Sequence, residues 1–538
     1  MSVPSRLPRP RSPRRLAAAL AFATLALAVP APDRARADPV TTKADEAARF
    51  FRDGPVPTLK ITVPDEGLAK WKEDPRAYVE CTVSDGKTVY EGVGIKLKGA
   101  IGSFRSLEDK PALTLRFAKF GGDVMFHGME KVYLNNSVQD ETYLHEWLGS
   151  ELFRAAGIPA PRVTHARVWL NGRDIGLHLC KEGHDKRFLR RHFEDPSGTL
   201  YDGGLGQDID SELERDEGPG PNDHKELQDL LYACEDTDAV RARPGIQAHL
   251  DVDKFLTFMA LERMVGHWDG YNWNRNNYRL YFDKTHRGVF VPHGMDQLFA
   301  DPNLSVFDEP VSIVGTAVMR DAEWAAAYHQ RIGELLAVFN PVDRWTKRMD
   351  EVVARLKPAV AGTAGPQNVG GLKTRFAARV KSLTAQAKQP APKPIELAQG
   401  EDLKLRSWRP VPGGEGMKLQ QVSFSGERVL RFECPAKGAE ATGTWRTKLL
   451  LMPGKYRLDG SFMVDDVATA GDPGKTGLWI KVLDGPQSEH LSGKGTWKPL
   501  SVEFDVADQP RQVEVLLELK ATKGTAYVRL FSLSLTRL

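Results

Sequence analysis

The sequence contains little cysteine, with four residues among 538. No two of them form a C-x-x-C pair, which excludes a zinc site or a dithiol redox centre made from closely spaced cysteines. Export would permit disulfides, but the wide spacing leaves their pairing open. The four residues are Cys81, Cys180, Cys234 and Cys434.

The chain also lacks a long hydrophobic run beyond residue 29. A helix needs about 20 predominantly apolar residues to cross a bilayer. We therefore expect no transmembrane segment once the N-terminal leader has been removed.

A general excess of positive charge is missing as well. The chain has 74 basic and 71 acidic residues, but residues 1–37 hold seven of the bases and one of the acids. The remaining chain has a net charge of −3. A protein that binds nucleic acid usually carries a basic surface, so we predict no nucleic-acid partner.

The N-terminus has the pattern of a signal peptide. Five arginines precede an apolar run from Leu16 to Val29, and Ala35-Arg36-Ala37 supplies a small-x-small site for cleavage before Asp38. These are the n-region, h-region and cleavage site of an exported protein. We predict a signal peptide at residues 1–37 and an extracellular, cell-surface or periplasmic location.

A stretch rich in proline and alanine divides the remaining chain into two regions of different periodicity. After a lead-in at residues 38–54, helical and strand patterns alternate over residues 55–385, and residues 386–396 form the predicted linker. Residues 397–538 contain only short alternating segments separated by turns. The sequence therefore predicts an α+β domain followed by an all-β sandwich.

The larger domain has two helix-and-hairpin patterns. The first pairs a helix, capped by Asp140 or Thr142 and running through Ala156, with strands at 162–170 and 175–180. Asn171-Gly172 joins the strands and suits a type I′ turn. The second pairs a helix at about 253–266 with strands at 278–282 and 289–291. Further helices are predicted at 322–339 and 343–356.

Polar side chains surround the second hairpin. Asp269 and four asparagines precede its first strand, and Asp296 follows its second. Antiparallel pairing brings these ends together, and carboxylate and amide oxygens suit Mg²⁺. In the alternative, Asp269 caps a turn and the asparagines hydrogen-bond to loop backbone. The asparagines are Asn272, Asn274, Asn276 and Asn277.

A succession of short motifs resembles the spore coat protein H (CotH) kinase family. The resemblance covers about residues 55–385, and its strength lies in the order of the motifs. They are Leu134-Asn135-Asn136 with Asp140, Gly157 to Arg162, Val168 to Gly172, Gly176-Leu177, Glu182, Phe188-Leu189, Leu200-Tyr201, Asn276 to Tyr281 and Met295-Asp296.

The resemblance implies a two-lobed atypical protein kinase that binds ATP with Mg²⁺, or Mn²⁺, and phosphorylates Ser or Thr of secreted or surface proteins. Asp269 would orient the acceptor hydroxyl, and Asp296 would hold the metal. His267-Trp268-Asp269 followed by Asn274 also echoes the H-R-D-x-x-x-x-N loop of ordinary kinases. The family pattern favours Asn276 or Asn277 as the metal amide, so Asn274 and Asn277 both remain candidates.

Three upstream residues are candidates for contacts to the nucleotide. Lys110, in front of Pro111, matches a basic residue of the family and is expected at the phosphates, with Arg105 as a weaker candidate in the loop 99–105. Glu182 follows the first hairpin, where a kinase chain would meet adenine. The alternatives are a solvated lysine and a salt-bridge glutamate.

The chain departs from the family at Gly294. Many relatives have an acid there, two residues before the one matched by Asp296, so an expected ligand is missing. The departure suits either a divergent active kinase or a catalytically degenerate surface or matrix protein that uses its domains for binding.

The C-terminal domain contains four tryptophans, and its pattern looks like jelly-roll modules that stack sugars on aromatic rings. A possible glycan partner follows, although tryptophans in the core of a sandwich explain the pattern equally. They are Trp408, Trp445, Trp479 and Trp497.

Overall fold

The computed structural model describes residues 41–538 except 122–124, 220, 237, 414–415, 435–439, 471, 473–474 and 508. The predicted signal peptide at residues 1–37 lies outside the described residues. Within them, no helix is both long and apolar enough to cross a membrane.

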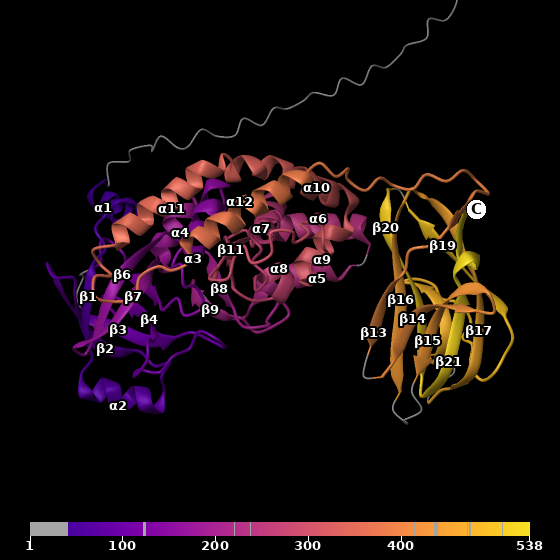
Figure 1. Cartoon of the computed structure of the whole chain (residues 1–538), viewed down its shortest axis with the longest axis horizontal. Coiled ribbons are helices and arrows are strands. Elements are labelled where there is room, and N and C mark those ends of the chain that lie inside the picture. The colour runs from indigo at the N-terminus through magenta and orange to yellow at the C-terminus, as the bar shows by residue number, and fades with distance from the viewer. Residues whose placement is uncertain are drawn as a thin grey trace, which may run out of the picture.

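The fold class is α+β, and Figure 1 shows a large mixed domain beside a smaller all-β domain. The large domain begins with helix α1 (Thr41–Arg52) and a closed barrel in the order β1-β2-β3-β4-β5-β7-β6. Helix α2 (Asp65–Glu73) connects the first two strands. The strands are β1 (Thr58–Thr62), β2 (Val79–Ser84), β3 (Val89–Lys98), β4 (Ala112–Arg116), β5 (Lys131–Asn135), β6 (Val163–Leu170) and β7 (Arg173–Glu182).

Side-chain alternation gives the barrel an apolar interior. Ile95, Leu113, Val132, Leu134 and Cys180 all belong to one buried hydrophobic cluster. Successive residues of a strand point to opposite faces. The neighbours of these core residues therefore point outward, and several of those neighbours are charged.

The first predicted hairpin is confirmed. Strands β6 and β7 pair antiparallel around Asn171 and Gly172, whose φ angles are +48° and +79°. Both angles lie in the left-handed region that a type I′ turn requires. The strands are each within a few residues of the predicted bounds.

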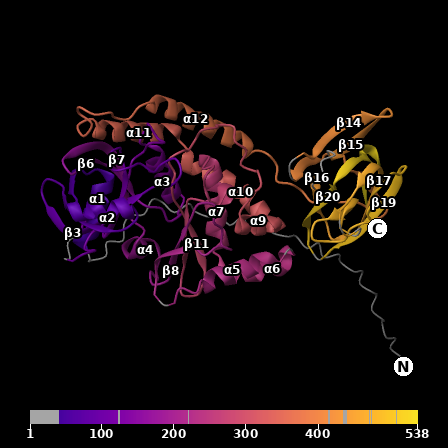
Figure 2. The same ribbon diagram turned by 90° about the horizontal axis from the view of Figure 1, so that it is seen from below.

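The rest of the large domain packs helices around a four-stranded sheet in the order β11-β10-β8-β9. Figures 1 and 2 both show α11 and α12 side by side along one edge of this domain. The elements are α3 (His145–Ala155), α4 (Lys186–His192), β8 (Thr199–Gly203), β9 (Glu214–Glu217), α5 (Lys225–Glu235), α6 (Ala239–His249), α7 (Val252–Val265), α8 (Tyr271–Asn274), β10 (Tyr278–Phe282), β11 (Gly288–Pro292), α9 (Ile313–Arg320), α10 (Ala322–Phe339), α11 (Val342–Leu356) and α12 (Val369–Gln386).

Helix α3 begins later than predicted. The sequence places its start at Asp140 or Thr142, but the helix begins at His145. The Asp140 carboxylate accepts hydrogen bonds from the backbone N–H groups of Thr142 and His145, at 2.9 Å each. Asp140 thus stabilises the turn before the helix, which sequence alone does not distinguish from a cap.

The C-terminal domain is a sandwich of two sheets. One has the order β12-β22-β17-β21-β15-β14, with β19 paired to β17, and the other has the order β13-β16-β20-β18. The strands are β12 (Asp402–Lys404), β13 (Arg409–Gly413), β14 (Lys418–Phe424), β15 (Glu427–Cys434), β16 (Ala441–Leu451), β17 (Gly454–Ala468), β18 (Gly477–Val482), β19 (Lys498–Val506), β20 (Arg511–Ala521), β21 (Lys523–Arg529) and β22 (Ser534–Arg537).

The predicted length of one strand of the sandwich is wrong. The alternating pattern at Ala526 to Leu535 predicts one continuous strand, but a 3₁₀ turn at Leu530–Ser532 separates β21 from β22. Leu530 and Leu533 are both buried in the core of the sandwich, so the turn keeps the apolar pattern while the backbone changes direction.

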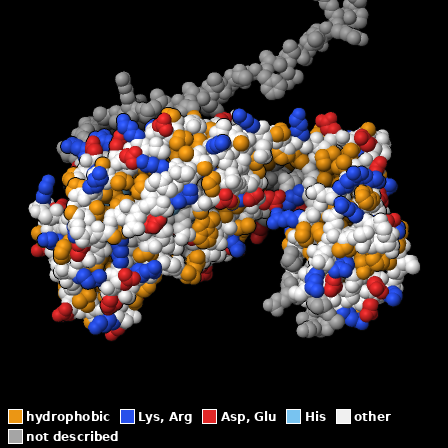
Figure 3. Space-filling view, in the orientation of Figure 1, with side chains coloured by type: hydrophobic (Ala, Val, Ile, Leu, Met, Phe, Trp, Pro, Cys, Tyr) orange, Lys and Arg blue, Asp and Glu red, His pale blue; other side chains and the backbone are white. Residues whose placement is uncertain are grey.

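Polar contacts between described residues join the two domains. Lys448 of β16 forms an ion pair with Glu309, and the Arg243 guanidinium donates to the Gln509 side-chain oxygen at 3.3 Å. Figure 3 shows acidic side chains of the large domain facing basic side chains of the sandwich at this junction, above an open notch.

Candidate active site

The loop after α7 carries the first predicted site residue. Gly266 ends the helix in the left-handed region at φ +70° and turns the chain into His267-Trp268-Asp269. The half-buried Asp269 carboxylate accepts hydrogen bonds from the side-chain amides of Asn274, Asn276 at 3.1 Å and Asn277 at 2.7 Å. The asparagines therefore hold the carboxylate in one orientation.

Glu262 anchors the same loop from within α7, and the sequence analysis missed it. Its buried carboxylate accepts from the backbone N–H groups of Tyr271 at 2.8 Å and Asn272 at 3.1 Å, and from the Asn272 amide at 2.7 Å. Burial raises the pKa of Glu262 to about 7. A Cβ on Gly270 would lie 2.4 Å from its Oε1, so only glycine fits there. The acid that directly follows the largely apolar run 255–261 of α7 was the available signal.

The second hairpin brings Asp296 next to this loop. Strands β10 and β11 pair Tyr278 with Pro292, and the His293 N–H donates to the Asn277 carbonyl at 3.0 Å. The adjacency of the two ends is as antiparallel pairing predicts. Burial raises the pKa of the Asp296 carboxyl to about 7, and the charges of Glu146, Asp140 and Asp269 add to the rise. A cation placed here would be attracted by all four carboxylates.

A buried ion pair lies beside Asp296. Lys181, near the end of β7, donates to Glu146 of α3 at 2.5 Å, and both side chains are at most 1% exposed. The Asn135 amide also donates to Glu146 at 2.5 Å. Lys181 contacts the His293 Nδ1 at 3.0 Å, so the pair touches the segment that carries Asp296.

Lys98 extends this cluster at the end of β3. Its ammonium donates to the Asn135 side-chain oxygen at 2.6 Å and lies 4.7 Å from the centre of the Tyr133 ring. Burial, together with the neighbouring charge of Lys181, lowers the pKa of Lys98 to about 7. Burial alone would raise the pKa of Glu146, but the charges of Lys181 and Lys98 hold it below the usual range.

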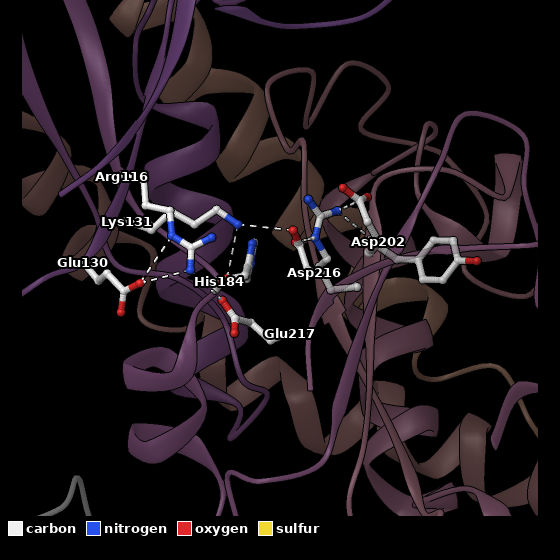
Figure 4. Close-up of polar contacts among 9 residues, drawn as sticks. Arg116, Glu130, Lys131, His184, Asp202, Asp216 and Glu217 are labelled. Atoms are coloured by element: carbon white, nitrogen blue, oxygen red, sulfur yellow. Dashed lines mark hydrogen bonds and ion pairs between the residues drawn. The ribbon is translucent and has the colours of Figure 1, made fainter. Parts of the chain in front are cut away.

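A second ionic network joins the barrel to the β8–β11 sheet (Figure 4). Lys131 of β5 reaches across to Asp216 of β9 at 3.2 Å, and Arg279 of β10 binds Asp216 at 3.0 Å and also Asp202 of β8. His184 lies beside Lys131, and burial among cations holds its pKa well below the usual range. The neutral imidazole leaves both ring nitrogens without a partner in the described residues.

The family model described as CotH kinase protein matches residues 95–390, which is more than half of the chain. The chain belongs to the CotH family. Inner spore coat protein H of Bacillus subtilis (strain 168) is 25% identical over 175 residues, covering 29% of this chain and 46% of that protein. Invasin CotH2 of Rhizopus delemar is 23% identical over 346 residues, covering 57% of each. The chain thus spans about half the length of these curated relatives.

Solved structures resemble only part of this CotH chain. The complex of TmCBM61 with beta-1,4-galactotriose has a TM-score of 0.19 and 14% identity, covering 24% of this chain and 88% of that one. The CBM22-1 xylan-binding domain from Paenibacillus barcinonensis Xyn10C has a TM-score of 0.17 and 9% identity, covering 26% and 97%. Scores this low assign neither fold nor ligand.

Within the CotH domain, Lys110 and Arg105 lie in the loop between β3 and β4. Lys110 donates to the Tyr143 hydroxyl at 2.7 Å, and burial lowers its pKa to about 8. Arg105 bonds to carbonyls of its own loop and lies 3.4 Å from Asp109. Their roles at the phosphates stay predictions, and the lysine that contacts the segment carrying Asp296 is Lys181.

Glu182 is buried at the end of β7 and is bound by two arginines. Arg162 donates to it from its backbone at 3.0 Å and from its guanidinium at 2.7 Å, and Arg191 forms a second ion pair. Burial alone would raise the pKa of Glu182, but Arg191 and Arg162 lower it to about 2. This arrangement favours the salt-bridge alternative, in the interior rather than at the surface.

The structure explains why this CotH chain has a glycine at position 294. Its φ is +56°, and a Cβ would lie 2.1 Å from the Asn277 side-chain oxygen. Asn277 therefore occupies the space that the side chain of an acid would need. The glycine at position 294, where many relatives have an acid, is therefore required by the position of Asn277, a predicted metal ligand.

We expect Gly294→Asp to destabilise the chain, because the new side chain displaces the Asn277 amide from Asp269. The strained φ adds a loss of stability of about 1 kcal/mol or more. Thermal denaturation of the variant and of Gly333→Asp, an open helical position, provides the measurement. A melting temperature of Gly294→Asp equal to that of Gly333→Asp would contradict the coupling.

The donor set fits a magnesium ion that takes only part of its coordination shell from the protein. Among the residues that the structure describes, no three His, Cys, Asp or Glu side chains are grouped to hold a metal by themselves. Mg²⁺ commonly takes one or two protein carboxylates and completes its shell with water and substrate phosphates. Asp296, with the amide oxygen of Asn277 or Asn274, supplies such a partial set.

Proposed function

We propose that the chain is an exported protein kinase that transfers the γ-phosphate of ATP to Ser or Thr of secreted or surface proteins. The names of the relatives, a spore coat protein and an invasin, support a surface location. In this proposal the barrel is one lobe and the helices with the β8–β11 sheet are the other. ATP lies where they meet.

The buried Lys181–Glu146 pair beside Asp296 is the observation that carries the proposal. Active protein kinases require a lysine paired with a helix glutamate next to a metal-binding aspartate. Here the lysine comes from the barrel, the glutamate from α3, and Asp296 from the segment after β11. A buried ion pair contributes little net stability by itself, so its presence suggests another use.

The other residues then have defined parts in the reaction. Asp269 orients the acceptor hydroxyl and accepts its proton while the Ser or Thr oxygen bonds to the γ-phosphorus. The bond between that phosphorus and the bridging oxygen of ADP breaks, and ADP leaves with the bond electrons. Asn274, Asn276 and Asn277 hold the Asp269 carboxylate toward the acceptor.

Lys181 and Lys98 bind the phosphate oxygens. Their ammonium groups lie together near Asn135 and Glu146, so that two positive charges face the same site. Asp296 and the Asn277 or Asn274 oxygen would hold Mg²⁺ or Mn²⁺, and the metal would supply positive charge that neutralises the phosphates. The Asn277 amide nitrogen bonds to Asp269, so its oxygen is turned away from that carboxylate.

Transfer from γ-labelled ATP by purified residues 38–538 tests the proposal. We expect label on the chain itself or on a co-secreted protein, dependent on Mg²⁺ or Mn²⁺. ATP should also raise the melting temperature. If neither label nor an ATP-dependent shift is found, the alternative holds: a degenerate surface or matrix protein that uses its domains for binding.

A further inference from the structure

The four tryptophans of the sandwich differ in their exposure to solvent. Trp445 and Trp479 are 3% and 4% exposed, and Trp408 packs against the core while its indole N–H donates to the Leu405 carbonyl at 2.9 Å. Trp497, before β19, keeps part of its ring exposed. Trp445 and Trp479 are thus unavailable for stacking on a ligand, and Trp408 is partly exposed but packs against the sandwich core.

Trp497 is joined by two other partly exposed aromatic residues. The Phe424 and Tyr527 rings stack with centroids 4.4 Å apart and planes at 28°. Phe424 lies 6.5 Å from Trp497, edge to face. The Arg529 guanidinium carbon lies 4.3 Å from the centre of the Trp497 ring. We call these four side chains the aromatic platform.

Strand register explains why the platform forms on the outer face. Leu430 and Val528 are cross-strand partners and belong to the sandwich core, so their neighbours Arg431, Tyr527 and Arg529 point outward. Val429 pairs with Arg529 and is fully buried outside that core. The platform therefore lies on the outer face of the sheet, with Phe424 on β14, Tyr527 and Arg529 on β21, and Trp497 directly before β19.

Planar polar groups border the rings. Arg529 forms an ion pair with Glu427 at 2.5 Å. Arg431 donates to the Gln420 oxygen at 2.5 Å and to Glu433 at 2.7 Å. These pairs hold guanidinium, carboxylate and amide groups at the edge of the aromatic surface, where they can form two hydrogen bonds with neighbouring hydroxyls.

We propose that the aromatic platform binds a polysaccharide made of β-linked pyranose units. Such a ring has a flat C–H face that packs on aromatic carbons and a rim of equatorial hydroxyls that needs planar polar partners. A protein partner of similar affinity needs a larger apolar area with fewer charges at its centre. This binding is independent of phosphate transfer and would hold the chain on a polysaccharide surface.

Affinity electrophoresis of residues 38–538 in gels containing β-1,4-galactan, xylan or β-1,3-glucan tests the proposal. We expect at least one polysaccharide to retard the chain. Trp497→Ala and Tyr527→Ala should each raise the dissociation constant about tenfold or more, a loss of about 1.4 kcal/mol. Tyr527→Phe, which keeps the ring, and Tyr232→Ala, which removes an aromatic 80% exposed on α5, should bind like the parent.

Melting curves show whether each variant is folded, and Phe424→Leu, which keeps the apolar bulk, replaces any alanine variant that is not. Absence of retardation by all three polysaccharides would overturn the proposal, as would equal retardation of folded platform variants. If sedimentation shows that Trp497→Ala converts a dimer to a monomer, the face belongs to a second copy of the chain instead.

Discussion

Replacing Asp269 or Asp296 by asparagine is expected to lower phosphate transfer about 10³-fold. Asp269→Asn removes the group that accepts the hydroxyl proton, and Asp296→Asn removes the carboxylate that holds the metal. The two losses should differ in their metal dependence. Raising Mg²⁺ or Mn²⁺ should recover part of the activity of Asp296→Asn and none of that of Asp269→Asn.

The stabilities of the two variants should also differ. Asp269 accepts hydrogen bonds from three asparagine amides, and an amide in its place leaves donors unpaired, which costs about 1–3 kcal/mol. Asp296 lies among like charges, so its neutralisation should cost little. Initial rates and melting curves of both variants beside Asp210→Asn, an exposed acid, provide the measurement. Normal transfer by either variant would end the kinase proposal.

Lys181→Met should both destabilise the chain and abolish transfer. The substitution leaves Glu146 ionised, buried and without its cation, which typically costs about 3–5 kcal/mol. Neutralising both partners in Lys181→Met/Glu146→Gln should recover most of this free energy of unfolding. The double variant should still be inactive, because the phosphates have lost their lysine.

Lys110→Met is the matched control, since it removes the lysine that the sequence analysis favoured. Its ammonium bonds to a neutral hydroxyl, so we expect a cost of about 1 kcal/mol and transfer within about fivefold of the parent. Urea denaturation and initial rates measured on the three variants distinguish the two lysines. Loss of transfer in Lys110→Met with normal transfer in the double variant would show that Lys110, and not Lys181, binds the phosphates.

Features set by local chemistry were predictable. Asn171-Gly172 determines a tight turn because both residues accept positive φ, and the strands on either side follow. The hairpin of β10 and β11 was predicted in the same way. It placed Asp269 near Asp296 because two strands joined by a short turn must end together.

The buried ion pair was not predictable. Lys181 and Glu146 are 35 positions apart, and each looks like an ordinary surface residue in its own segment. Their contact requires the barrel to close and α3 to pack against its outer face. The sequence analysis predicted Glu182, and not its neighbour Lys181, as a contact to the nucleotide. Alternation along β7 places these two side chains on opposite faces, so the prediction of one gave no indication of the other.

The amino-acid sequence by itself determined the CotH family, the α+β class, the all-β C-terminal domain and the two hairpins. The family was identified by its resemblance, through the order of its short motifs, whereas periodicity and turn residues encode the α+β class, the all-β domain and the hairpins over a few positions. The tertiary structure alone decided that Lys181 pairs with Glu146, that Asn277 requires Gly294, and that Trp445 and Trp479 are buried while Trp497 stays partly exposed. Burial and long-range pairing depend on which surfaces meet, and that is a property of the whole fold.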